Sequence, residues 1–309
     1  MATTLTNMID EVSMNLSGYT LTQDRSTYIE SAVTATASSS ASPIILELGS
    51  TDNVGKGIVE INEELMWIDS YDRVGNTATV APYGRGYLGT TIAAHAVDDK
   101  VTISPTFPRF TIKRAINDTI TALGSSIFAA STTTITSNSA VAAFRLPATG
   151  SSLEIKNILS VAYQAIGASK EWVPIRSWRF DANANSTAFT SGQTISIYDV
   201  VPSGRTIQIV YAKDPQPFTT NAQVFTTQTG LPESCKDLVI IGATYRLLTN
   251  LDPARAAMVS PQADETDNKR PYGSSQSLTR QIFALYSQRL AEEVKNQQTN
   301  YPIRVHYSL

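Results

Sequence analysis

The apolar residues of the stretch 105–123 (PTFPRFTIKRAINDTITAL) recur with the period of an α-helix. Four of them step by three or four residues, namely Ile112, Ile116, Ile120 and Leu123. Pro108 suits the first turn of such a helix, where its missing N–H is no loss, and Gly124 ends it. Because a single amphipathic helix cannot bury its own apolar stripe, we expect this helix to pack against other helices.

Further stripes of the same period lie near both ends of the chain. We expect two helices before residue 34, the first ending at Gly18 and the second spanning residues 22–33. A helix should follow Pro232, and a last one should cover residues 278–298. The apolar stripes of these last two helices are Leu238, Ile241 and Tyr245, and Ile282, Tyr286 and Leu290. We predict that these residues and the four central ones form the core of one helical bundle.

Short apolar runs with turn residues between them fill the two intervals between the helices, and they indicate β-strands. The first interval has runs at 44–48, 58–61, 65–68, 77–83 and 100–104. The second has runs at 142–146, 153–163, 172–180, 194–198 and 206–213, preceded by a polar stretch at 131–140. Five strands at this spacing are typical of a small barrel in the first interval and of a β-sandwich in the second.

These patterns predict an α+β fold in which a helical bundle is the hub and two antiparallel β modules are inserted into it. The hub would take residues 1–41, 105–130 and 231–299. The barrel-like module would take residues 42–104, the β-sandwich module residues 131–230, and an extended arm residues 300–309.

The arm (NYPIRVHYSL) has a strict period of two, which is the pattern of a strand with one apolar face. Pro302 prevents the preceding helix from continuing into it. Its residues are Ile303, Arg304, Val305, His306, Tyr307 and Leu309, with Ser308 on the polar side. A terminal strand has no hairpin partner, so it must pair with a sheet of its own subunit or with a sheet of another chain.

Composition excludes several classes of protein. The net charge is −3, charged residues make up 17%, and no basic block is present, so a broad nucleic-acid-binding surface is not expected. The single cysteine, Cys235, excludes an internal disulfide and a cysteine-rich zinc site. The N-terminus lacks the pattern of a signal peptide, and no apolar run approaches the roughly 20 residues of a membrane span. We therefore expect the cytosol, or a particle assembled there.

No group of residues in the sequence makes up an active site. The glycines Gly84, Gly86 and Gly89 match G-x-G-x-x-G, but no helix follows them and Asp98 comes too early for the ribose of a dinucleotide. They indicate a structural turn. We interpret His95, Asp98 and Asp99 as a surface loop and not a metal site, and Cys235 as a packed thiol. The sequence thus predicts no enzyme and no catalytic, cofactor or metal-binding residue.

Three motifs resemble the adaptor proteins at the neck of tailed bacteriophages. They comprise Arg85, Gly86, Leu88, Gly89, Thr90 and His95, then Pro108, Arg109, Ala115, Ile116 and Asn117, then Pro232, Asp237, Leu238, Gly242 and Ala243. The resemblance implies a structural protein that needs no cofactor and forms a ring of about twelve subunits. It further implies a virion protein assembled in the host cytoplasm that joins the portal to the tail or to the next neck protein, with no membrane partner.

The same resemblance implies that DNA passes through the ring without sequence reading, and that the arm 303–309 docks on the portal. Two other hypotheses remain open from the sequence. One is another tail-completion or baseplate protein of the virion. The other is a carbohydrate-binding β-sandwich, because Trp172 and Trp178 would share one face of a single regular strand and stack on sugars.

Overall fold

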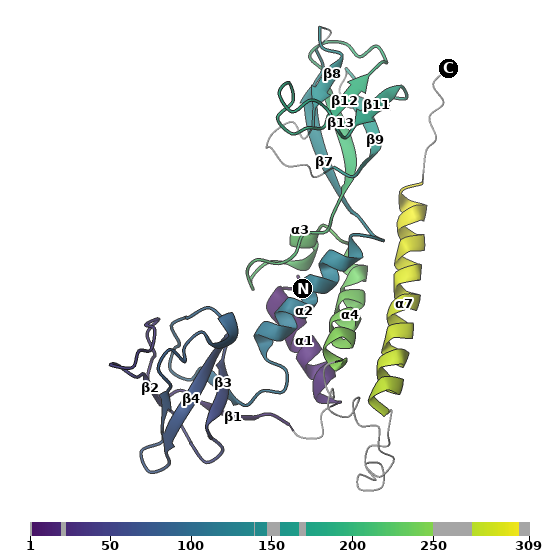
Figure 1. Cartoon of the computed structure of the whole chain (residues 1–309). Helices are drawn as coiled ribbons and strands as arrows, with labels where there is room; N and C mark the ends of the chain where they lie inside the picture. The colour runs from purple at the N-terminus through teal and green to yellow at the C-terminus, as the bar shows by residue number, and fades with distance from the viewer. Residues whose placement is uncertain are drawn as a thin grey trace. The chain divides into compact units, whose positions relative to one another are not determined.

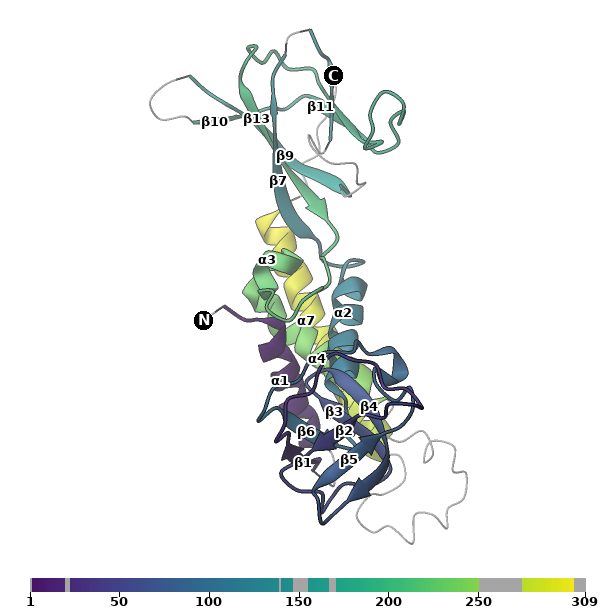
Figure 2. The same ribbon diagram turned by 90° about the vertical axis from the view of Figure 1, so that its left-hand side faces the viewer.

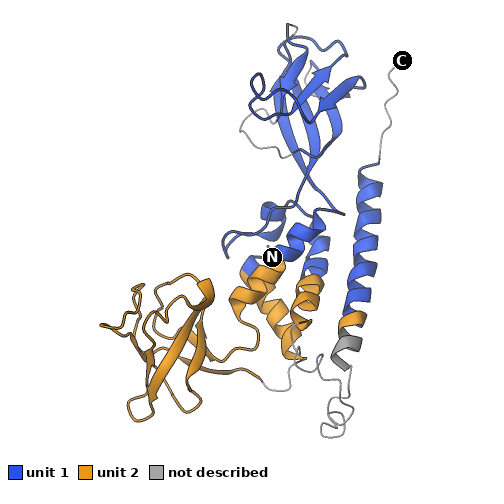
Figure 3. Cartoon of the chain, in the orientation of Figure 1, with its two compact units in different colours: residues 1–5, 117–239, 281–309 blue, residues 6–116, 240–280 orange. Residues whose placement is uncertain are grey.

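Thirteen β-strands and a few helices make up the part of the chain that the computed structural model describes (Figure 1). That part comprises residues 2–19, 23–138, 140–146, 155–166, 171–249 and 274–302. The chain divides into two units, which we describe separately (Figure 3). Unit 1 contains residues 1–5, 117–239 and 281–309, and unit 2 contains residues 6–116 and 240–280.

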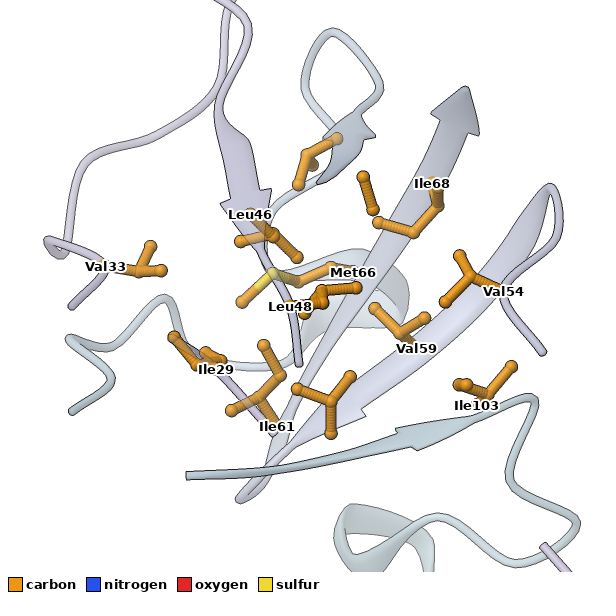
Figure 4. Packing of buried hydrophobic residues seen from close by; sticks show 13 residues of the cluster. Ile29, Val33, Leu46, Leu48, Val54, Val59, Ile61, Met66, Ile68 and Ile103 are labelled. Atoms are coloured by element: carbon orange, nitrogen blue, oxygen red, sulfur yellow. The ribbon is translucent and has the colours of Figure 1, made fainter. Parts of the chain in front are cut away.

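Unit 2 holds a six-stranded antiparallel sheet in the order β1-β6-β3-β4-β5-β2. Figure 2 labels its strands. Its strands are β1 (Arg25–Tyr28), β2 (Ile45–Glu47), β3 (Gly57–Ile61), β4 (Glu64–Asp72), β5 (Thr77–Val80) and β6 (Lys100–Ile103). Apolar side chains from all these strands except β1 gather in one buried cluster, completed by Ile29, Val33, Leu48 and Val54 (Figure 4). The short apolar runs predicted for this module correspond to β2, β3, β4, β5 and β6.

Unit 1 holds two further antiparallel sheets, in the orders β10-β9-β13-β7 and β11-β12-β8. The four-stranded sheet consists of β7 (Ala129–Thr136), β9 (Asn157–Gln164), β10 (Trp172–Pro174) and β13 (Thr206–Lys213). The three-stranded sheet consists of β8 (Ala143–Arg145), β11 (Trp178–Asp181) and β12 (Thr194–Ile197). One buried cluster draws on both sheets, including Ile135, Ile158, Ile195, Ile207 and Ile209. Side chains of two sheets interleave in this way in a β-sandwich.

The helices are α1 (Leu5–Ser17), α2 (Arg109–Leu123), α3 (Phe225–Thr229), α4 (Lys236–Leu248) and α7 (Ser274–Asn300), with short 3₁₀ turns at Tyr87–Gly89 and Glu233–Cys235. The α2 stripe Ile112, Ile116, Ile120 and Leu123 is buried, and so is Leu238 of α4. By contrast, Ile241 and Tyr245 of α4 and Ile282, Tyr286 and Leu290 of α7 are only half-buried.

The predicted fold class is wrong. The described residues form a mainly β structure, with thirteen strands in three antiparallel sheets and a few helices, and not a helical bundle that serves as a hub. The physical reason is that burial of apolar surface is not directional, so a helical stripe does not require helices as its cover. In addition, the α7 stripe that the bundle needed stays half-exposed.

Three local predictions also fail. The segment 22–33, predicted as a helix, contains β1, whose β-branched Thr27 and the following buried Ile29 suit a pleated surface. The polar stretch 131–140, which was not among the predicted strands, begins inside β7, since threonine favours strands even without apolar neighbours. Finally, 172–180 is not one strand but β10 and β11, which belong to different sheets, so Trp172 and Trp178 share no strand face.

Candidate functional site

A buried carboxylate organises the glycine-rich turn of unit 2. Glu64 is the first residue of β4 and is 1% exposed. It follows the turn at Asn62, whose φ of 57° allows β3 to reverse directly into β4. Arg85, from the turn after β5, and His95, further along the chain, both reach this carboxylate and are equally buried.

Glu64 accepts hydrogen bonds from five donors. Its Oε1 accepts from Arg85 Nε at 2.5 Å and from Gly86 N at 3.1 Å. Its Oε2 accepts from Arg85 Nη2 at 2.8 Å and from Ala93 N at 3.0 Å, and it lies 2.9 Å from His95 Nε2. The pair with Arg85 is therefore bidentate, which is the strong geometry for such a pair.

Arg85 extends the network to the backbone. Its Nη1 donates to Thr34 O at 3.0 Å and its Nη2 donates to Ala93 O at 2.6 Å. A single ion pair thus ties together β4, the glycine turn, the segment before β2 and the segment around Ala93. A buried charge pair is tolerable only when its remaining hydrogen-bonding capacity is satisfied in this way.

The pKa of Glu64 reflects these contacts. Burial alone would raise the pKa, but the hydrogen bonds from Arg85, His95 and Ala93 N outweigh it and lower the pKa from 4.5 to about 2. Glu64 is therefore ionised in the folded protein at neutral pH, and its oxygens are fully used by neighbouring donors. The cluster is a structural cross-link and offers no group for chemistry on a substrate.

The prediction that His95 belongs to a surface loop is wrong. His95 is 2% exposed, and its backbone N and O both bond to Val33 at 2.9 Å. Its Nδ1 lies 3.9 Å from Asp99 Oδ2. The partner of His95 could not be predicted from the sequence, because Glu64 is 31 residues away. Glu64 also follows a second glutamate, Glu63, which pairs with Lys113 at 2.9 Å. No group of residues suited to a metal ion occurs in the described part of the chain.

The glycines of the turn are needed for backbone shape at two positions. Gly86 has a φ of 62°, and a Cβ there would lie 2.8 Å from Thr90 O. A Cβ on Gly84 would lie 2.8 Å from Ala81 O and 2.9 Å from Trp67 O. These contacts are with backbone oxygens, which cannot swing aside as a flexible side chain can.

Replacing Gly86 with Val should therefore destabilise unit 2 by about 2 kcal/mol or more, because a β-branched residue is strained at positive φ and also meets Thr90 O. Thermal unfolding of the variant measures this loss. Gly89→Ala is the control for backbone strain alone, because the φ there is also positive, at 81°, but a Cβ meets nothing within 4 Å. It should therefore cost less stability than Gly86→Val. If Gly86 held a cofactor instead, saturable nucleotide binding would be lost in Gly86→Val while the stability stayed the same.

A second buried carboxylate stands at the start of α2. Glu60 on β3 accepts a hydrogen bond from Arg109 N at 2.5 Å, so it caps one of the unpaired N–H groups that begin a helix. Burial raises the pKa of Glu60 to about 7, even though Arg109 N and the Arg109 charge lower it. This contact fixes the first turn of α2 on the sheet of the same unit, together with the Lys113–Glu63 pair.

In unit 1 a groove runs along the C-terminal half of α7. It has a volume of about 540 Å³, and its lining includes Phe128, Ala130, Leu231, Pro232 and Tyr301. Gln297 of α7 bonds to both Phe128 N, at 3.1 Å, and Phe128 O, at 2.6 Å. The Tyr301 ring lies 5.7 Å from the Phe128 ring.

Charged contacts fix α7 at the other end of the groove. Arg289 donates to Asp237 Oδ2 at 2.8 Å, to Glu292 at 2.6 Å and to Glu293 at 2.9 Å. These contacts raise the pKa of Arg289 further above its usual range, with Asp237 as the main cause. Burial, with the nearby Glu293 charge as a second cause, raises the pKa of Cys235 to about 12, so its thiol is packed and not a nucleophile.

The predicted docking-arm residues, Ile303, Arg304, Val305, His306, Tyr307 and Leu309, lie outside the described residues. The chain that precedes them is described as far as Pro302. Among the described helices, none is long and apolar enough to cross a membrane.

Both buried carboxylate sites and the α7 contacts hold backbone segments of the fold together. The model of the SU10 adaptor protein family matches residues 88–305, about 70% of the chain. The chain belongs to this family, so it is a phage structural adaptor and a virion component. The resemblance to neck adaptors is thereby confirmed. Family membership also implies a protein that is not an enzyme. Comparison with individual curated proteins gives no match.

Proposed function

We propose that this protein forms a closed ring of about twelve subunits that joins the portal vertex to the tail or to the next neck protein. The ring is assembled in the host cytoplasm and continues the DNA channel. The observation that carries this proposal is the family match, which begins in the glycine-rich turn and continues through α2, both sheets of unit 1, α4 and α7.

The surface of α7 supports subunit contacts. This helix has 27 residues, which corresponds to a length of about 40 Å. Phe283 is 48% exposed and Leu285 is 49% exposed, next to the half-buried Ile282, Tyr286 and Leu290. Large apolar residues gathered on one exposed helix are a common feature of protein–protein interfaces. A heterologous contact between such helices and the next subunit would close into a ring.

The charge balance supports a passive channel. DNA-binding proteins hold phosphates with clustered lysine and arginine, and their affinity grows with the number of phosphates contacted. This chain has 24 basic and 27 acidic residues and a net charge of −3. Such a ring would let DNA slide past without gripping it or reading its sequence.

We further propose that the C-terminal arm docks on the portal by adding a strand to a portal sheet. Ile303, Val305, Tyr307 and Leu309 would fill apolar pockets, and Arg304 and His306 would face the polar side. The family match extends to residue 305 and so includes the beginning of the arm.

A chain that ends at Pro302 tests the docking arm. We expect it to stay folded, because α7 and the Tyr301–Phe128 contact remain, but to lose binding to purified portal rings. Thermal unfolding of the protein alone shows that it is folded, and co-sedimentation with portal rings measures binding. The full-length chain with Ser308→Ala is the matched control and should bind normally.

Portal binding that survives the truncation would refute the docking arm. The ring itself is tested separately, by negative-stain images of the full-length protein with and without portal. If the protein stays a monomer, never joins portal rings, and a label on it lies away from the neck in intact particles, a role as a tail-completion or baseplate protein would be favoured instead.

A further inference from the structure

The strand β7 is an edge without the usual protection. Among the described residues it pairs only with β13, at one end of the order β10-β9-β13-β7 (Figure 2). Its sequence, AASTTTIT, contains no charged residue and no proline. Natural edge strands normally carry lysine, proline or a bulge, or are covered, because their free N–H and C=O groups attract other strands.

The register shows which backbone groups of β7 face outwards. Ser137 N donates to Arg205 O at 2.7 Å, so the odd-numbered residues of β7 bond to β13. Lys156 N donates to Ala212 O at 2.8 Å, so the even-numbered residues of β13 face β9 and not β7. Hydrogen-bonded and outward-facing residues alternate along an antiparallel edge. Since β7 and β13 pair without a bulge, the outward residues are Ala130, Thr132, Thr134 and Thr136.

This edge begins inside the α7 groove. Ala130, the first outward residue, lines the groove together with Phe128, Pro232 and Tyr301. The groove provides apolar surface at the point where the row of outward N–H and C=O groups starts. An extended peptide needs this combination of apolar pockets and backbone partners when it adds to a sheet.

The chain itself supplies a segment of matching length and pattern at this place. α7 ends at Asn300, and Tyr301 contacts Phe128, one residue before β7 begins. The seven residues 303–309 lie outside the described residues. Extended, they would span about 23 Å, against about 26 Å for the eight residues of β7. Their apolar residues alternate with polar ones, as a strand with one buried face requires.

We infer that, in the free subunit, residues 303–309 add to the edge of β7 as a fifth strand of the same chain's sheet. The added strand runs parallel to β7, because both segments leave the Phe128–Tyr301 contact. A segment tethered beside its site has an effective concentration in the millimolar range, which favours this pairing over one between two dilute subunits. The portal then takes the arm from β7; this exchange rests on the proposed function, but docking in the free subunit does not.

Hydrogen exchange on the free protein, without portal, tests the inference. The full-length chain is compared with the full-length variants Val305→Pro and Val305→Thr and with the chain ending at Pro302. We expect the peptide 129–136 to exchange about tenfold faster at its outward amides in Val305→Pro and in the truncated chain, because both remove the added strand. Val305→Thr keeps the backbone donors and the β-propensity, so it should exchange like the full-length chain.

Equal exchange of this peptide in all four proteins would overturn the inference. So would protection that appears only as protein concentration rises, because that would mean that the arm of a second copy covers the edge. The peptide containing β10, at the opposite edge of the sheet, should exchange alike in all four proteins. If the truncated chain fails to bind portal although β7 exchanges equally in all four proteins, the proposed function is supported and this inference is wrong.

Discussion

Replacing Arg85 with Met should destabilise unit 2 by about 3–5 kcal/mol, because it leaves the Glu64 carboxylate buried without its bidentate partner. His95 and two backbone N–H groups would remain on Glu64, but the bidentate contact with the guanidinium charge would be lost. The unfolding of unit 2 can be followed through Trp67 alone if Trp172 and Trp178 of unit 1 are first replaced with Phe.

The exposed pair Lys56–Asp69 provides a matched control. Its nitrogen–oxygen distance is 3.2 Å, but the two side chains are 69% and 57% exposed. Lys56→Met should therefore cost no more than about 1 kcal/mol. The double variant Glu64→Leu with Arg85→Met should recover much of the loss, since an apolar pair removes both buried charges. A loss in Arg85→Met no larger than that in Lys56→Met would contradict the role of this network.

The effect of pH on this loss has a definite sign. The pKa of Glu64 is depressed to about 2 in the folded protein from an ordinary value of 4.5. Its contribution to stability is therefore fully present above about pH 4.5 and is lost as the pH falls towards 2. In Arg85→Met the main cause of the depression is gone, so the difference in stability from the parent protein should shrink over the same pH range. A difference that stays constant from pH 6 to pH 3 would exclude Glu64 as its source.

Sequence patterns predicted the strands better than the way in which the elements pack. The runs 58–61 and 206–213 are short, rich in isoleucine and valine and bounded by turn residues, so they led directly to β3 and β13. The helix α2 was equally clear from its stripe and from Pro108. Local periodicity and turn chemistry determine such elements, and both are visible along the chain.

The packing of the helices could not be predicted in the same way. An apolar stripe shows that one face of a helix must be buried, but not whether a helix, a sheet or another chain buries it. The apolar stripe of α2 is buried within the chain. In contrast, Ile282, Tyr286 and Leu290 of α7 are only half-buried in the single subunit. Membership of an adaptor family gives a physical reason for this difference, because another virion protein can cover the rest of this face.

The buried cluster around Glu64 was missed for a related reason. The motif residues Arg85, Gly86 and His95 were recognised, but their common partner lies some twenty to thirty residues before them. Residue type alone does not distinguish Glu64, which is buried, from Glu63, which forms a partly exposed pair with Lys113. The period of two along β4 contained the signal: Glu64, Met66 and Ile68 lie on one face of that strand, so Glu64 points to the core side.

Replacing Ile116 with Asp should have an effect of similar size, in the middle of α2. Ile116 is fully buried, so the substitution places an unpaired carboxylate in an apolar site and also removes the packing of the isoleucine. We expect a loss of about 4 kcal/mol or more, which would leave the protein insoluble or unable to assemble. Soluble yield and size-exclusion with light scattering measure the outcome.

Two controls separate the charge from the position. Ile116→Val keeps the site apolar and should cost only about 1 kcal/mol. Thr111→Asp introduces the same charge on the exposed side of the same helix, in its first turn, where the helix dipole favours a negative charge. It should therefore be neutral within about 0.5 kcal/mol. If Ile116→Asp gave the same yield and the same assembly state as Thr111→Asp, Ile116 would have to face solvent in the folded chain, and the α2 stripe would not be part of a core.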